Sequence, residues 1–262
     1  MIHGETCYTG AAGGFLIRWL LNERKEYKEI QIPVDPTEKR QLLRSLMNVH
    51  PPVPIDNEFL TVQDAYLQER LAERGVTRIG DLSPVRPGIY LWQGDITTLA
   101  ADGIVNAANS QMLGCFVPCH GCIDNAIHTY AGVQLRQECA SIMAGQKAEQ
   151  TGSAKITKAY NLPCRYVLHT VGPIIYGVVT ETDRKLLADC YRSCLDLAAA
   201  YGLHSLAFCC ISTGEFHFPN RLAAEIAVMT VEEWQKENPD QMEVIFDVFK
   251  DNDYKIYRQL LR

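Results

Sequence analysis

The sequence predicts a layered α/β domain with helices on both faces of its sheet, preceded by a helical extension. After residue 83, short apolar strands alternate with amphipathic helices, the pattern typical of such a sheet. Before it, apolar residues recur at helical spacing. The composition changes over residues 82–88, which include two prolines and a glycine. We therefore expect an N-terminal helical extension over residues 1–82 and a main domain over residues 83–262.

Helical segments separated by prolines make up the extension. Residues 1–14 are rich in small residues and show little pattern, so the first helix is expected to begin at Phe15, and Cys7 to be a lone thiol. Further helices are predicted over residues 38–47 and roughly 58–73, on either side of a proline-rich connector. The charged residues of the last helix are expected on a solvated surface: Glu69, Arg70 and Arg74. The extension either packs on the main domain or recruits a partner, and packing is the simpler interpretation.

The elements of the main domain follow from apolar runs and helical periodicity. Strands are predicted over residues 89–93, 103–107, 154–159, 166–171, 205–211 and 242–249. Helices are predicted over residues 124–139, 182–201, 221–237 and 253–261. Ligands of layered α/β sheets usually lie beyond the carboxyl ends of the strands, so the turns after the strands are the places to look for a site.

Composition narrows the class of protein. The net charge of −6 gives no support for nucleic acid or a membrane surface as a partner, although backbone N–H groups can still hold phosphate. The start of the chain lacks the pattern of a secretory signal, and ten cysteines without one favour a reducing cytoplasm. Six cysteines in apolar surroundings are interpreted as core residues: Cys139, Cys164, Cys190, Cys194, Cys209 and Cys210.

A metal loop is predicted at residues 114–125, where three thiols and an imidazole lie within eight residues: Cys115, Cys119, His120 and Cys122. Thiolate and neutral imidazole are ligands that Zn²⁺ prefers. If all four bind, the site is closed and structural; if three bind, a position stays open for water or substrate. A loop without metal is the third possibility. Neighbours such as Cys119 and His120 tend to point in different directions, which favours the open site.

Three turns after strands carry polar residues. Asp95 can accept from an exocyclic amine, or it can simply cap a helix. Asn106 and Asn109 can bind ribose hydroxyls without adding charge, or they can be ordinary turn residues. Residues 211–219 include Gly214, where the backbone can approach a pyrophosphate, and the alternative is a plain loop before a helix. His128 and His169 lie on regular elements and are interpreted as core histidines.

Taken together, these motifs resemble the macrodomain family in order and spacing, from about residue 85 onward. The motifs are Gly94-Asp95-Ile96-Thr97, Val105-Asn106-Ala107-Ala108-Asn109, Asp124-Asn125-Ala126-Ile127-His128, Thr151-Gly152-Ser153-Ala154, His169-Thr170-Val171-Gly172-Pro173 and Ile211-Ser212-Thr213-Gly214. The resemblance implies a three-layer α/β/α fold with a mixed central sheet, and ADP-ribose as ligand. Many hydrolytic macrodomains have glycines where this chain has its cysteines. The loop is similar to that of the zinc-containing microbial branch, which is associated with sirtuin-type ADP-ribosyltransferases and has an N-terminal helical extension.

The resemblance also implies roles for individual residues. Asp95 would bind the adenine amine, with the Ile96 backbone beside it, and Asn106 and Asn109 would line the distal ribose side. The diphosphate and distal ribose would be wrapped by Ser212, Thr213, Gly214, Glu215 and Phe216. Zn²⁺ would be held by Cys115, His120 and Cys122. Asp124 matches the acidic catalytic position, with Asn109 as a second catalytic residue.

The function expected from this resemblance is zinc-dependent removal of ADP-ribose from mono-ADP-ribosylated protein side chains. Zinc beside the distal ribose would polarise a ribose oxygen or lower the pKa of a bound water, and Asp124 would orient or deprotonate the attacking water. Two alternatives remain open: a module that binds ADP-ribose without turnover, and a hydrolase of O-acetyl-ADP-ribose. A module that only binds has no need of a metal loop at the ribose, which favours the enzyme.

Overall fold

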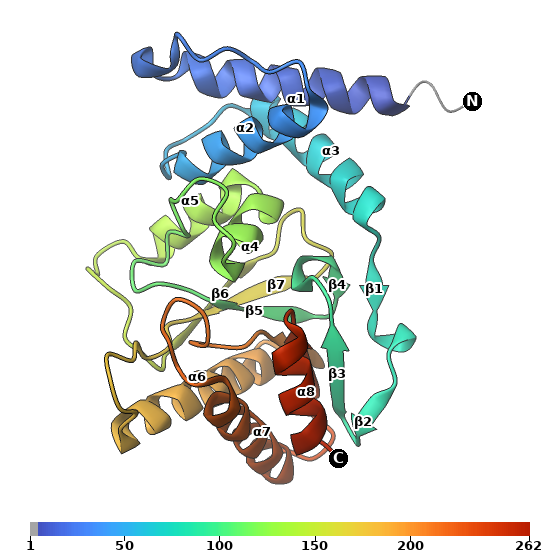
Figure 1. Cartoon of the computed structure of the whole chain (residues 1–262), viewed down its shortest axis with the longest axis vertical. Helices are drawn as coiled ribbons and strands as arrows, with labels where there is room; N and C mark the ends of the chain where they lie inside the picture. Colours follow the sequence, from blue (N-terminus) through green and yellow to red (C-terminus); the bar gives the residue numbers. More distant parts are fainter. Residues whose placement is uncertain (1–4) are drawn as a thin grey trace.

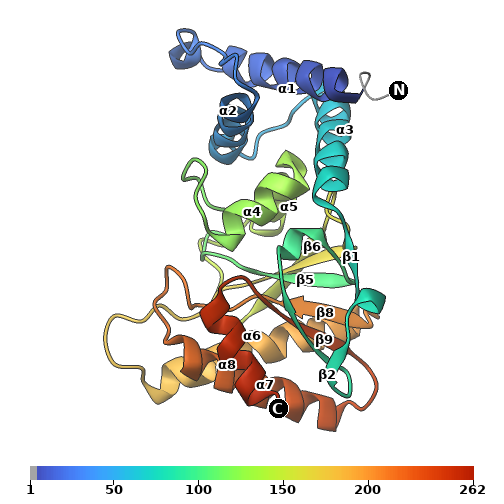
Figure 2. The same ribbon diagram turned by 45° about the vertical axis from the view of Figure 1, so that its right-hand side comes forward.

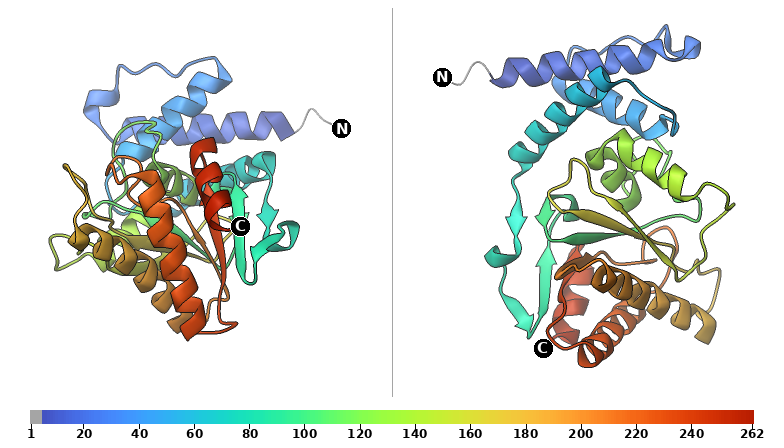
Figure 3. Two further views of the ribbon diagram at one scale, coloured as in Figure 1. Left: turned by 60° about the horizontal axis from the view of Figure 1, so that its bottom comes forward. Right: turned by 180° about the vertical axis from the view of Figure 1, so that it is seen from behind.

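The computed structural model describes residues 5–262, with side chains from residue 10 onward, so Cys7 lies outside the described side chains. A mixed sheet lies at the centre, with helices α4 and α5 on one side and α6, α7 and α8 on the other (Figures 1 and 2). Helices α1, α2 and α3 lie at one end, beyond α4 and α5 (Figure 3). The predicted three-layer architecture with an N-terminal helical extension is confirmed.

The sheet has the strand order β2-β3-β9-β8-β5-β7-β6. Its strands are β2 (Pro84–Arg86), β3 (Ile89–Gln93), β5 (Gly103–Ala107), β6 (Ala154–Lys158), β7 (Tyr166–Thr170), β8 (Ser205–Phe208) and β9 (Glu243–Val248). The five inner strands run parallel, whereas the edge strands β2 and β6 are antiparallel to their neighbours. The carboxyl ends of the inner strands therefore share one edge, and the predicted site residues lie at those ends or in the segments that follow them.

The helices of the main domain are α4 (Ile123–Ala131), α5 (Val133–Ile142), α6 (Glu181–Ala200), α7 (Asn220–Glu237) and α8 (Asp251–Leu260). The prediction of a single helix over residues 124–139 is wrong, because the helix is interrupted at Gly132, whose φ is +98°. A β-carbon there would lie 2.7 Å from the Gln63 amide nitrogen. Gln63 instead accepts a hydrogen bond from the Val133 N–H at 3.0 Å and so starts α5 from the extension.

The extension contains α1 (Glu5–Asn22), the 3₁₀ turn η1 (Lys25–Tyr27), α2 (Pro36–Val49) and α3 (Asn57–Arg74). Helix α1 begins ten residues before the predicted start at Phe15. The small residues that obscure the pattern allow close packing: a β-carbon on Gly13 would already lie 3.6 Å from the Tyr66 ring of α3. Leu16, Ile17 and Phe59 are fully buried in the core of the extension, which also includes Val133 of the main domain.

Short elements join the extension to the main domain. Strand β1 (Thr77–Arg78) pairs in parallel with β4 (Leu99–Ala100), and the turns η2 (Ile79–Asp81) and η3 (Ile96–Thr98) flank these strands. Arg74, expected on a solvated surface, instead lies 3.7 Å above the centre of the Tyr130 ring and pairs with Asp95. That prediction is wrong because the end of α3 packs against the main domain.

The main core lies between the sheet and its helices. Cys139, Cys164, Cys190, Cys194 and Cys209 are buried in it, as predicted, and Cys210 is half-buried. Strand β8 ends at Phe208, three residues before its predicted end, because residues 209–219 leave the sheet as a loop. Among residues 5–262, no helix combines the length with the apolar character needed to cross a membrane.

Candidate active site and metal loop

The metal loop brings three predicted ligands together. The ligand atoms of Cys115, His120 and Cys122 all lie within 4.8 Å of one another. Cys115 Sγ and His120 Nδ1 are 3.6 Å apart. In a tetrahedral zinc site, bonds of about 2.0–2.3 Å place neighbouring donor atoms about 3.3–3.8 Å apart. The donor set and its spacing therefore fit Zn²⁺.

Cys119, the fourth candidate, points away from this group. Its Sγ lies 3.2 Å from Ser45 Oγ and donates to the Gln41 carbonyl oxygen at 3.4 Å, both on helix α2. Its backbone has a φ of +53°, in the left-handed region. A closed site with four ligands would require this side chain to turn away from α2, so the geometry favours the open alternative.

The surroundings of the ligands also suit a cation. His120 turns Nδ1 toward Cys115 and Nε2 toward Glu215 Oε1, 3.6 Å away. Metal-binding histidines commonly place their second ring nitrogen near a carboxylate. Cys122 is the N-cap of α4, and burial raises the pKa of its thiol to about 12. Without a cation, the thiolates of Cys115 and Cys122 would repel each other. Binding of a metal ion would therefore have to displace the proton of the Cys122 thiol.

Asp124 lies in the first turn of α4 and is almost completely buried. Its Oδ1 accepts a hydrogen bond from Asn106 Nδ2 at 2.8 Å, and its Oδ2 accepts one from Asn109 Nδ2 at 3.3 Å. Burial raises the pKa of the carboxyl to about 6, although the Asn106 hydrogen bond acts in the opposite direction. Both predicted asparagines thus converge on the predicted catalytic carboxylate. Asn106 is itself fully buried, and its predicted place on the distal ribose side remains a prediction.

Two histidines lie behind Asp124. His169 Nδ1 contacts Asn106 Nδ2 at 3.1 Å, and its Nε2 contacts Thr157 Oγ1 at 2.9 Å. Since the Asn106 amide is a donor, Nδ1 must accept and Nε2 must carry the proton. His169 is thus a core histidine with both nitrogens paired, as predicted. His128, also buried, has neither ring nitrogen hydrogen-bonded among the described residues; its Nε2 is 3.6 Å from Asp124 Oδ1.

Asp95 follows β3, which is separated from β5 by β9 and β8 in the sheet. Its Oδ1 accepts from the Thr97 N–H at 3.0 Å and caps the turn η3. Its Oδ2 accepts from Arg74 Nη1 at 3.0 Å. The capping alternative is therefore present in the structure. The predicted role of Asp95 and the Ile96 backbone in binding adenine remains a prediction.

The loop after β8 has the features of an anion site. Ser212 is buried with a φ of +63°, which turns the chain sharply. Within the described residues, the N–H groups of Gly214, Glu215 and Phe216 donate to no protein acceptor. The Phe216 carbonyl accepts from the Ile175 N–H at 2.9 Å, which joins this loop to the one after β7. Free N–H groups in a small-residue loop suit a diphosphate.

Sequence reasoning missed four polar residues around the metal loop. Asn125, completely buried, donates from Nδ2 to the Val117 carbonyl at 3.0 Å. Arg136 donates from Nε to the Leu113 carbonyl at 2.6 Å, and its guanidinium lies over the Phe116 ring. Arg44 and Asn48 reach the loop from α2. The positions of Arg44 and Asn48 on an amphipathic helix gave no indication of a role at the site, because the loop that they contact lies more than 70 residues away in the chain.

The fold is that of a layered α/β protein with a candidate site at the carboxyl ends of its strands, and comparisons with known proteins specify the family. The family model "Macro domain" matches residues 105–227. The chain is 57% identical to "Protein-ADP-ribose hydrolase" of Treponema medium, over 94% of this chain and 97% of that protein. It is 48% identical to the protein of the same name from Staphylococcus aureus strain MSSA476, over 94% and 93%. The chain belongs to the macrodomain family.

A solved structure supports the same assignment. The macrodomain of Trypanosoma brucei in complex with ADP-ribose superposes with a TM-score of 0.66 at 33% sequence identity. The match covers 87% of this chain and 96% of that one. Because the match covers 87% of this chain, the similarity extends beyond residues 105–227, which the family model matches.

Proposed function

We propose that this chain is a hydrolase that removes ADP-ribose from mono-ADP-ribosylated protein side chains and depends on Zn²⁺. The observation that carries the proposal is the juxtaposition of the Cys115–His120–Cys122 group with the buried Asp124 carboxylate at the start of α4. The enzyme class is that of relatives at 48% and 57% identity that are named protein-ADP-ribose hydrolase.

The residues of the chain divide the work. The free N–H groups of residues 214–216 would hold the diphosphate, and the Asp95 carboxylate would accept from the adenine amine. These contacts would bring the distal ribose beside the metal loop, because the 211–219 loop touches that loop through Glu215 and His120. The substrate is thus oriented before reaction, which contributes to rate by fixing the reacting atoms.

Asp124 is the proposed general base. Asn106 and Asn109 hold its two oxygens, and a carboxyl with a pKa of about 6 can accept a proton near neutral pH more readily than an ordinary one. Water would attack the anomeric carbon of the distal ribose while the bond to the protein side chain breaks. Zn²⁺ bound by Cys115, His120 and Cys122 would supply Lewis acidity at a ribose or water oxygen.

Release of ADP-ribose tests the proposal. Zinc-loaded protein is incubated with proteins carrying ADP-ribose on Asp/Glu, Ser or Arg, and free ADP-ribose is measured alongside binding. We expect release from at least one linkage, and loss of release in the Asp124→Asn variant. Binding without release on every substrate would contradict the enzyme and indicate a reading module. Turnover of O-acetyl-ADP-ribose alone would redirect the substrate assignment.

Zinc dependence needs a separate arm. Protein stripped by a chelator should lose release and regain it on addition of Zn²⁺; full activity in protein without zinc would exclude the metal from the reaction. A sirtuin-type ADP-ribosyltransferase is the proposed source of the modified substrate, which places this chain opposite to that enzyme in a reversible modification. Protein modified by such a transferase is therefore the first substrate to test.

A further inference from the structure

Helix α2 of the extension contacts the metal loop through Arg44. Its Nη2 donates to the His120 carbonyl oxygen at 3.0 Å and to Asn125 Oδ1 at 2.7 Å. Asn125 in turn holds the Val117 carbonyl from its other side-chain end. One half-buried guanidinium thus connects the backbone of a proposed metal ligand with the side chain that braces the middle of the same loop.

Asn48, one turn further along α2, contacts Cys119, the residue before His120 in the metal loop. Its Oδ1 accepts from the Cys119 N–H at 2.9 Å, and its Nδ2 donates to Thr129 Oγ1 of α4 at 2.9 Å. The Cys119 N–H and the His120 carbonyl are thus both held by α2, one on each side of the peptide bond between these residues. Cys119 adds its thiol contacts to Ser45 and Gln41, so it belongs to this attachment and not to the ligand group.

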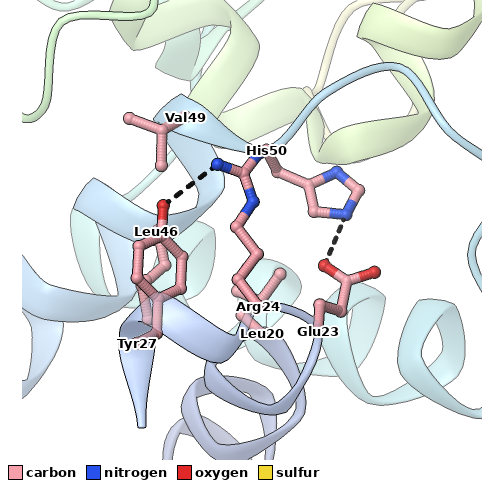
Figure 4. Close-up of a pocket in the computed structure, with 7 residues that line it drawn as sticks. All are labelled: Leu20, Glu23, Arg24, Tyr27, Leu46, Val49 and His50. Carbon is pink, nitrogen blue, oxygen red and sulfur yellow. Dashed lines mark hydrogen bonds and ion pairs between the residues drawn. The ribbon is translucent and has the colours of Figure 1, made fainter. Parts of the chain in front are cut away.

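Helix α2 is itself held firmly enough to serve as a support. At its carboxyl end, Arg136 of α5 donates to the Met47 and His50 carbonyl oxygens. His50 Nε2 lies 2.9 Å from Glu23 Oε2 at the edge of a small cavity between α1 and α2 (Figure 4). Leu43 and Leu46 are buried in the core of the extension. A hydrogen bond from a fixed helix restricts a loop more than one from a mobile side chain.

We propose that α2 is a positioning element of the active site: Arg44 and Asn48 hold the Cys119–His120 backbone so that the His120 ring faces Cys115 and Cys122. The extension therefore contributes to metal binding as well as to packing. This inference rests on the proposed function for its catalytic meaning. The contacts to the loop are present whatever the substrate.

Metal affinity of Arg44→Met tests the inference, with Arg40→Met as the matched control. Methionine keeps an unbranched apolar stem and removes every donor. Arg40 is one turn away on the same helix, exposed, and hydrogen-bonded to Thr37 alone among the described residues. Zinc affinity is measured by competition with a chelator, and the ligand geometry by the absorption spectrum of the cobalt-substituted protein. Loss of a supporting contact around a metal site typically costs roughly 10- to 100-fold in affinity, and we expect that loss for Arg44→Met.

Thermal unfolding of the metal-free proteins separates positioning from folding. We expect Arg44→Met to unfold cooperatively, with weaker zinc affinity and an altered cobalt spectrum, and Arg40→Met to match the wild type. Arg44→Lys keeps the charge without the planar fork and should recover part of the affinity. If Arg44→Met does not fold, Arg44→Lys decides: zinc affinity equal to the wild type overturns the inference.

Failure of the proposed function would show elsewhere. A wild-type protein that binds zinc and cobalt but releases no ADP-ribose contradicts the hydrolase and leaves the positioning role intact. Unchanged zinc affinity and cobalt spectrum in Arg44→Met contradict the positioning role, whatever the activity of the wild type. The two ideas are therefore tested by different measurements on the same preparations.

Discussion

Replacing Cys122 and Cys119 one at a time should have opposite consequences for zinc content. Cys122 Sγ belongs to the three-ligand group, whereas Cys119 Sγ faces Ser45 and Gln41 on α2. Structural zinc sites bind with on the order of 10–16 kcal/mol shared among four ligands, or about 2.5–4 kcal/mol for each ligand. Loss of the Cys122 thiolate should thus weaken zinc binding roughly 100- to 1000-fold.

Cys119→Ser is the matched control because a serine hydroxyl can keep both contacts to α2. We expect its zinc affinity to stay within about threefold of the wild type, since no ligand is lost and about 0.6 kcal/mol corresponds to that factor. Zinc per chain is measured by elemental analysis after dialysis against graded concentrations of a chelator. Equal loss of zinc in Cys119→Ser and Cys122→Ser would show a closed site with four ligands, and the open position proposed for substrate would not exist.

Three further outcomes follow from the same geometry. Asp124→Asn should lower kcat by roughly 100- to 10,000-fold, the usual contribution of a general base, with ADP-ribose affinity by calorimetry nearly unchanged; near-normal turnover would remove Asp124 from the mechanism. Asp95→Asn keeps the cap of η3 but removes the negative charge. The hydrogen bond proposed between this side chain and the adenine amine should lose about 1 kcal/mol, so ADP-ribose should bind roughly fivefold more weakly. Unchanged affinity would leave Asp95 with its capping role alone. Burial lowers the pKa of His169 to about 3, below the value of about 6.5 in the unfolded chain, so the unfolded state binds the proton first as the pH falls. The free energy of unfolding should therefore fall as the pH drops from about 6.5 toward 3, by up to about 1.4 kcal/mol per pH unit. Urea unfolding of the wild type and of His169→Gln at several pH values checks this. An equal dependence of the free energy of unfolding on pH in the two proteins would contradict it.

Local pattern was sufficient for the regular elements of the main domain. Strands β3 and β5 occupy the residues predicted for them, and α6 and α7 begin within one residue of their predicted starts. Each of these elements buries an apolar face, and the face is written in the spacing of its residues. The same reasoning failed at Gly132, where the break between α4 and α5 depends on Gln63 from another part of the chain. It also missed the start of α1, whose small residues pack closely but show no periodicity.

The chemistry divides in a similar way. The residue types at positions 115–124 indicated a zinc-binding loop followed by a carboxylate, because thiol, imidazole and carboxylate have that chemistry in any fold. The resemblance already implied that Cys119 is not a ligand, and the tertiary structure supplies the physical reason. Cys119 turns to α2, and Arg44 and Asn48 secure the loop there. These contacts join residues more than 70 positions apart, and hydrogen bonds between such distant residues leave no periodic trace in the sequence. The proposed ligands are thus encoded locally, whereas the contacts proposed to orient them arise from the packing of the extension against the main domain.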